Sequence, residues 1–148
     1  MIKAIIISFS LLIIVSCHSA KKMDTSASQP SVELRETYWK LTELSGVAVP
    51  EVREGEKETY LKLRTDSLRV EGNGGCNGFG GTYELKEGNR INFSKMISTM
   101  MYCSRMETEN ALFKGLEATD NYTISGDVLQ LNKARMAPLA KFVAVSNK

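Results

Sequence analysis

The chain has 148 residues, with 19 Lys and Arg against 17 Asp and Glu, and a formal net charge of +2. Charges of both signs are interspersed, which excludes the concentrated basic surface of a nucleic-acid-binding protein. The only histidine is His18, so a Ser-His-Asp or Cys-His catalytic arrangement has no base to use.

Residues 1–16 are typical of a lipoprotein signal peptide. Lys3 supplies a positive charge, and an apolar run of about a dozen residues leads to a small serine before Cys17. The run is too short to cross the ~30 Å hydrocarbon core as a helix, so a cleaved signal is favoured over an anchor. Residues 14–17 resemble the bacterial lipobox, which implies a diacylglycerol thioether on Cys17. An ordinary signal with an incidental cysteine is the alternative.

Residues 17–34 are predicted to hold the lipidated cysteine and a flexible tether, because they are mostly small and polar. A segment of ~15 residues has a typical end-to-end distance of roughly 20–23 Å. Removal of Lys3 with the signal lowers the formal charge by one, from +2 to +1. His18, rather than the aspartate associated with inner-membrane retention, follows Cys17, so we expect attachment to the outer membrane.

Residues 35–148 are expected to form one strand-rich domain. Eight segments are predicted as strands from alternating hydrophobicity and flanking turn residues: 38–44, 60–64, 68–71, 82–85, 90–93, 122–124, 128–131 and 139–145. The fold class is therefore α+β, a compact domain of about seven or eight mostly antiparallel strands, curled or barrel-like, with one helix around residues 105–118.

The helix is predicted from its start and its periodicity. Ser104 and Glu107 have the spacing of a capping box, in which each side chain bonds the other residue's backbone amide. The residues that follow at helical spacing are mostly apolar: Glu109, Leu112, Phe113 and Leu116. Cys103 then lies just before a helix N-terminus, where a free thiol would be reactive.

Cys76 and Cys103 are interpreted as a disulfide pair, because a secreted domain matures in an oxidising compartment. A bridge closing a loop of this size stabilises a fold by roughly 3–4 kcal/mol in the chain-entropy model. Free or redox-active thiols are the alternative.

Two blocks of sequence resemble one known family. Residues 75–83, G-C-N-G-F-G-G-T-Y, resemble the G-C-N-x-aromatic-x-G-x-Y signature of the META domain family, which includes HslJ-like bacterial envelope lipoproteins. Residues 93–103 are similar to its second block, which ends in S-T-x-M-x-C. The likeness extends over residues 36–145. Met100 stands where the family often has arginine, so an anion-binding role for that arginine does not transfer.

The resemblance implies a compact, strand-rich domain in the bacterial envelope, associated with heat and envelope stress and without an established enzymatic activity. The glycine-rich run 72–78 fits neither a dinucleotide fingerprint nor a P-loop. Its glycines are expected to supply positive φ and close backbone approach around the disulfide. Asn77 and Thr99 are candidate turn-structuring residues, with ligand contact as the alternative, and Trp39 is expected in the core.

Four methionines lie near Cys103 in the sequence: Met96, Met100, Met101 and Met106. Thioethers can hold Cu(I), but we favour their filling gaps in the core. No metal or cofactor is expected.

The sequence thus predicts a non-catalytic, lipid-anchored envelope protein that supports or binds partners in the outer membrane under stress. Partners would be the membrane, through acylated Cys17, and an envelope protein or glycan. The alternatives are a small-ligand or copper- or redox-related binding module, and an enzyme that uses Glu107 with Glu109. Helix capping and the helix dipole explain those two acids more simply.

Overall fold

A computed structural model describes residues 32–146. The predicted signal peptide, the predicted lipidation site Cys17 and most of the predicted tether lie outside these residues. The elements that the structure describes are β1 (Tyr38–Leu44), β2 (Val47–Ala48), β3 (Tyr60–Leu63), β4 (Arg69–Asn73), β5 (Gly78–Lys86), β6 (Arg90–Ser98), α1 (Met106–Ala118), β7 (Asn121–Ser125), β8 (Val128–Asn132) and β9 (Ala140–Val145).

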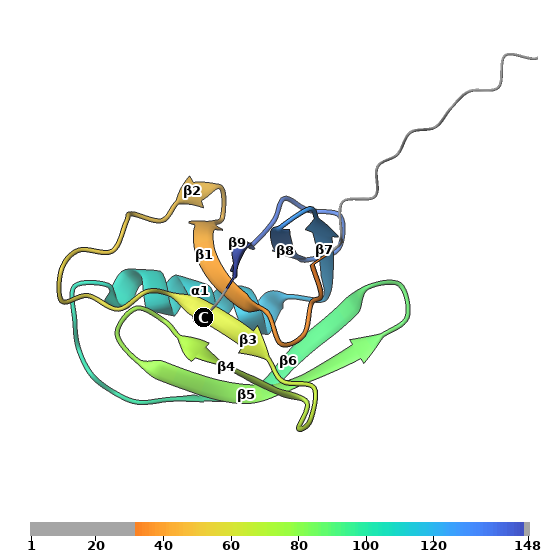
Figure 1. The fold of residues 1–148 in the computed structure, drawn as a ribbon, viewed down its shortest axis with the longest axis horizontal. Coiled ribbons are helices and arrows are strands. Elements are labelled where there is room, and N and C mark those ends of the chain that lie inside the picture. The colour runs from red at the N-terminus through yellow and green to blue at the C-terminus, as the bar shows by residue number, and fades with distance from the viewer. Residues whose placement is uncertain (1–31, 147–148) are drawn as a thin grey trace, which may run out of the picture.

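The strands within residues 32–146 form one antiparallel sheet that closes on itself (Figure 1). Neighbours follow the order β2-β1-β3-β4-β5-β6-β7-β8-β9, and β1 also pairs with β9 along most of its length. The first and last strands of the domain therefore lie side by side, and the sheet is a ring with β2 at its edge. The predicted strand-rich α+β fold with a curled sheet and one helix is confirmed.

All eight predicted strands are present, and β5 and β6 extend well beyond their predicted bounds. β5 begins at Gly78, inside the run predicted only as a glycine turn, and β6 continues to Ser98. The extension is possible because a bulge at Lys95, which has φ 52°, places an extra residue of β6 opposite Gly81. A Cβ on Gly81 would meet Met96 Sδ and would lie 3.0 Å from the Ser94 carbonyl oxygen, so a larger residue would displace its neighbours in β6.

The core fills the ring with side chains from every part of the domain. Those that are almost fully buried are Trp39, Leu61, Leu63, Val70, Ile91, Leu112, Leu116, Leu129, Leu131 and Phe142. Trp39 is confirmed as a core residue, and its indole Nε1 donates a hydrogen bond to the Leu34 carbonyl at 2.9 Å. Leu34 is itself buried, so the packed domain includes residues just before β1.

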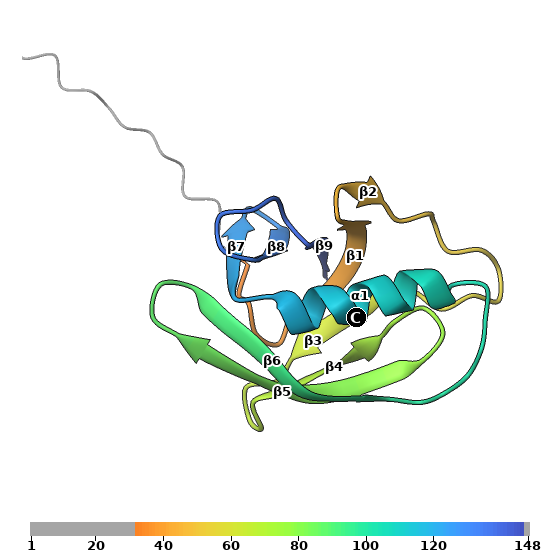
Figure 2. The same cartoon turned by 180° about the vertical axis from the view of Figure 1, so that it is seen from behind.

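Helix α1 lies across one side of the ring (Figure 2) and packs against β6 and β1. It connects β6 to β7, which form the narrowest junction of the sheet because they are paired only at Arg90 and Asn121. Its buried face consists of Glu109, Leu112, Gly115 and Leu116.

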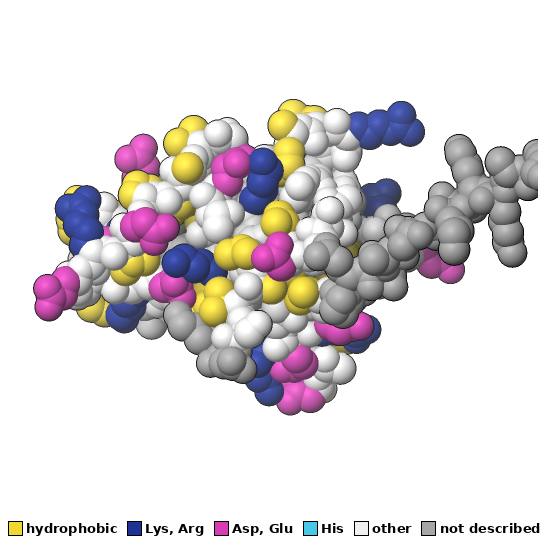
Figure 3. All heavy atoms as spheres, turned by 45° about the horizontal axis from the view of Figure 1, so that its top comes forward, with side chains coloured by type: hydrophobic (Ala, Val, Ile, Leu, Met, Phe, Trp, Pro, Cys, Tyr) yellow, Lys and Arg dark blue, Asp and Glu magenta, His cyan; other side chains and the backbone are white. Residues whose placement is uncertain are grey.

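Two surface properties accompany this fold. Basic and acidic side chains are interspersed on the face drawn in Figure 3. Among residues 32–146, no helix is both long and apolar enough to cross a membrane.

Truncation of a side chain inside the ring tests this account of the core. Leu61 is fully buried and lies opposite Trp39 in the β1–β3 pair. Leu61→Ala is expected to lower the free energy of unfolding by about 2–5 kcal/mol, because it leaves a cavity in the core. Urea unfolding followed by fluorescence of the single tryptophan measures this loss. Val47→Ala, at a 70 % exposed position, is the control and should change little.

Candidate functional site

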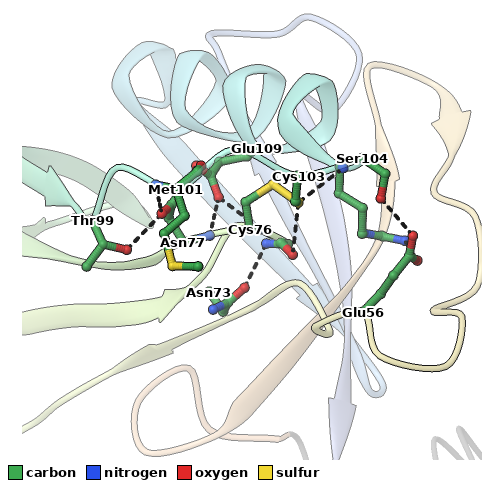
Figure 4. The surroundings of a disulfide bond; sticks show 11 residues. Glu56, Asn73, Cys76, Asn77, Thr99, Met101, Cys103, Ser104 and Glu109 are labelled. Carbon is green, nitrogen blue, oxygen red and sulfur yellow. Dashed lines mark hydrogen bonds and ion pairs between the residues drawn. A yellow bond between two sulfur atoms is a disulfide. The ribbon is translucent and has the colours of Figure 1, made fainter.

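The Cys76–Cys103 disulfide joins the β4–β5 turn to the segment that precedes α1 (Figure 4). The two Cα atoms are 5.6 Å apart across a sequence separation of 27. The predicted pairing is therefore confirmed. Cys76 is 5 % exposed and Cys103 is half-buried, so the bridge lies mostly inside the domain.

Asn77 fixes the loop that leads to the disulfide. Its side-chain Nδ2 donates to the Met101 carbonyl at 2.9 Å and to Glu109 Oε1 at 2.7 Å. Its Oδ1 accepts from Thr99 Oγ1 at 2.8 Å and from the Met101 amide at 2.7 Å. An asparagine amide offers two donor and two acceptor positions, and all four are used. Asn77 and Thr99, the two candidate turn-structuring residues, are therefore hydrogen-bonded to each other, and the Asn77 side chain has no hydrogen-bonding position left for a ligand.

Glu109 holds the glycine turn from the helix side. Its buried Oε2 accepts hydrogen bonds from the backbone amides of Cys76 at 3.2 Å and Asn77 at 2.7 Å. These amides, with Asn77 Nδ2, are the partners that a buried carboxylate needs. Figure 4 shows Glu109 reaching from α1 towards Asn77 and Cys76.

Two glycines allow this close approach, as predicted. A Cβ on Gly74 would lie 2.5 Å from Cγ of Glu109, so a larger residue would push the helix away. Gly75 has φ 111°, a conformation that residues with a side chain rarely adopt. The glycine run therefore shapes the turn around the disulfide.

The segment held by Asn77 exposes large apolar side chains. We call residues 99–102 the apolar loop: Met100 is 98 % exposed, Met101 61 % and Tyr102 90 %. The prediction that the methionines fill the core is wrong for Met100 and Met101, because the loop's hydrogen bonds to Asn77 hold it at the surface. Met96, by contrast, does pack against the core.

A hollow of about 350 Å³ lies between the apolar loop and α1. Its lining includes Met106 and Phe113 from the helix and the three exposed side chains of the loop. Glu109 also lines it, but both oxygens of that carboxylate are already hydrogen-bonded. The hollow therefore presents mainly apolar groups above a polar base that is already satisfied.

The start of α1 is held by a long-range contact, and the predicted capping box is wrong. Arg105 occupies the N-cap position without a side-chain capping bond, and the Ser104 hydroxyl donates to Glu56 Oε1 at 2.9 Å. Arg105 Nη1 lies 3.4 Å from Glu56 Oε2, and the Arg105 side chain is 7 % exposed. Backbone bonding from Arg53, followed by the Ser104 hydroxyl, lowers the pKa of the Glu56 carboxyl.

The two acids considered for catalysis do not share a site. Glu109 is buried in the Asn77 network, whereas Glu107 is exposed. Within residues 32–146 there is also no group of three or more His, Cys, Asp and Glu side chains placed to hold a metal ion.

Sequence reasoning missed the roles of Glu109, Arg105 and Glu56. Each depends on a contact between segments that are far apart in the chain. The acids at the start of the helix suggested a dipole effect, and no pattern in the sequence indicated that one of them reaches back to Cys76.

An isosteric change at Asn77 tests the network. Asn77→Asp replaces the donor to Glu109 by a second carboxyl group, so the free energy of unfolding at pH 7 should fall by about 3 kcal/mol or more. The deficit should shrink as the pH is lowered, because one of the two carboxyl groups then takes up a proton and donates to the other.

Urea titrations from pH 7 to pH 4 would measure this trend. Asn110→Asp, on the exposed side of the same helix, is the matched control and should show no comparable deficit. A deficit for Asn77→Asp that does not depend on pH would contradict the proposed carboxyl–carboxyl contact.

Comparison with known proteins identifies the fold. A solution NMR structure of a protein from Burkholderia xenovorans is 25% identical, with a TM-score of 0.62, and the match covers 77% of this chain and 85% of that one. A second NMR structure is 17% identical, with a TM-score of 0.58, and the match covers 74% of this chain and 90% of that one. At this identity the likeness shows the fold alone. No curated protein matches. The family model of the META domain matches residues 32–146, and the chain therefore belongs to the META domain family.

Proposed function

We propose that this protein is a lipid-anchored component of the bacterial cell envelope whose META domain binds a protein partner and catalyses no reaction. Acylated Cys17 would hold it at the outer membrane, and binding would support the envelope during heat or envelope stress. Membership of the META family and the lipobox-like residues 14–17 support the anchoring and the location.

The apolar loop is the observation that carries the binding role. Exposure of apolar side chains to water is unfavourable, yet three hydrogen bonds to the Asn77 side chain fix this loop at the surface. A surface of this kind, aromatic and methionine-rich beside a hollow, suits the centre of a protein–protein interface.

Charge substitutions in the apolar loop test the proposal. The double variant Met100→Asp/Tyr102→Asp should fail to restore heat tolerance to a deletion strain that the unchanged chain restores. Both side chains face solvent, so the variant's stability should stay within about 0.5 kcal/mol. Met136→Asp, at an apolar position that is 66 % exposed, is the control and should restore tolerance fully.

A photo-crosslinking residue at position 102 should give a discrete protein adduct in cells, whereas the same residue at position 136 should not. Full rescue by the double variant, together with no adduct at position 102, would contradict the proposal.

A second candidate is copper binding, since the thioethers of Met100, Met101 and Met106 line one hollow. It predicts that the full chain removes Cu(I) from a chromogenic chelator and that Met100→Leu/Met101→Leu abolishes this transfer. If all the Cu(I) stays on the chelator, copper binding is excluded as a function.

A further inference from the structure

A second hollow, of about 670 Å³, lies on the outer face of the sheet formed by β3, β4, β5 and β6. The pairing register of β4, β5 and β6 explains why this hollow exists. Glu71 is opposite Gly80, and Gly80 is opposite Ile97, while Asn73 is opposite Gly78. Gly78 and Gly80 are neighbouring positions on this face of β5. They therefore leave a gap between the side chains of β4 and those of β6, which we call the notch. With strands ~4.8 Å apart, the resulting notch is about 10 Å wide.

The fold does not require glycine at these two positions. Neither Gly78 nor Gly80 has positive φ. A Cβ on Gly78 would be 3.9 Å from its nearest neighbour, and a Cβ on Gly80 would be 3.4 Å from Arg69 Nη2, so both have room. Gly72, by contrast, is needed, because its Cβ would collide with the Tyr60 carbonyl.

Glycine in a strand interior weakens the strand, since it loses more conformational entropy on folding and packs nothing. Gly78 and Gly80 therefore lower the stability of β5 for a reason that the fold does not explain. They also fall at the two unspecified positions next to the aromatic residue in G-C-N-x-aromatic-x-G-x-Y. Their structural effect is to keep the notch open.

The rim of the notch carries charged, aromatic and hydroxyl groups. The Arg69 guanidinium extends over Gly80 and has no hydrogen bond or ion pair with any residue between 32 and 146. Glu71 lies 3.8 Å from Arg64 Nη1, so its charge is partly balanced. Tyr60 is fixed by stacking on Tyr38, with ring centroids 4.2 Å apart. Ile97, which is 67 % exposed, forms an apolar wall.

This set of groups favours a ring with hydroxyl groups over an extended peptide. The floor is sheet backbone whose amides and carbonyls are paired within the ladder, so it offers few backbone partners to a peptide strand. The rim provides a donor in Arg69, an acceptor in Glu71 and a phenol in Tyr60, which suit hydroxyls that both donate and accept. The unpaired guanidinium suits a carboxylate.

We propose that the notch binds an acidic oligosaccharide, with one sugar ring over Gly78 and Gly80 and its carboxylate on Arg69. The volume lies within the range of ligand sites. This inference goes beyond the proposed function and does not depend on the apolar loop.

The test uses the full chain in a detergent without a sugar headgroup, titrated calorimetrically with three probes. Tetragalacturonate carries rings and carboxylates, maltotetraose carries rings alone, and tetraglutamate carries carboxylates alone. We expect tetragalacturonate to bind more tightly than either of the others by about tenfold or more, the equivalent of one good charged contact.

Variants then locate the site. Gly80→Val should weaken tetragalacturonate binding by about tenfold or more by filling the notch, while its thermal midpoint is not lowered, because valine suits a strand with room for it. Arg69→Gln should remove the preference over maltotetraose. Glu84→Val, on the same face of β5 but outside the notch, is the matched control and should bind normally.

Three results would overturn the proposal. They are absence of tetragalacturonate binding at millimolar concentration, equal binding of tetraglutamate, and full affinity in Gly80→Val. The Met100→Asp/Tyr102→Asp variant should bind the saccharide normally, so failure of the protein-partner role and failure of this site are distinguishable.

Discussion

Everything at the disulfide end of the domain depends on one side-chain amide. Asn77 joins the glycine turn, helix α1 and the apolar loop, and each of its four hydrogen-bonding positions serves one of these connections. A buried amide with every position filled is rigid, because any rotation leaves a donor or acceptor unpaired. The covalent bridge between Cys76 and Cys103 brings the same segments together, and the amide then fixes how they are oriented.

Two surfaces of different chemistry meet at the end of β6. Ser98 and Thr99 line both the apolar hollow and the outer notch. On the helix side the neighbours are methionines and aromatic rings, and on the sheet side they are Arg69, Glu71 and Tyr60. Thr99 also bonds Asn77, so the network that positions the apolar loop also fixes one wall of the notch. The same network therefore supports two proposed binding surfaces that differ in polarity.

The sequence predicted the eight longer strands, the helix, the disulfide and the place of Trp39, because each depends on local pattern or on composition. It did not predict how far β5 extends, since glycines that turn the chain at residues 74–75 look the same as glycines within a strand at residues 78–81. It also assigned Met100 and Met101 to the core, because hydrophobicity alone cannot reveal that an asparagine distant in sequence holds them at the surface. Arg105 and Glu56, about 50 residues apart, meet only in the folded chain.

The single paired position between β6 and β7 gives α1 a second role. Apart from Arg90 and Asn121, the facing sides of these two strands have no partner strand among the described residues. Free strand edges are templates for pairing with other chains and so for aggregation. Because α1 connects β6 to β7 and lies against β6, we expect its undocking to expose this unpaired side of β6. We therefore expect that weakening the contacts at the start of α1, through Glu109 and Glu56, would favour self-association of the domain as well as lower its stability.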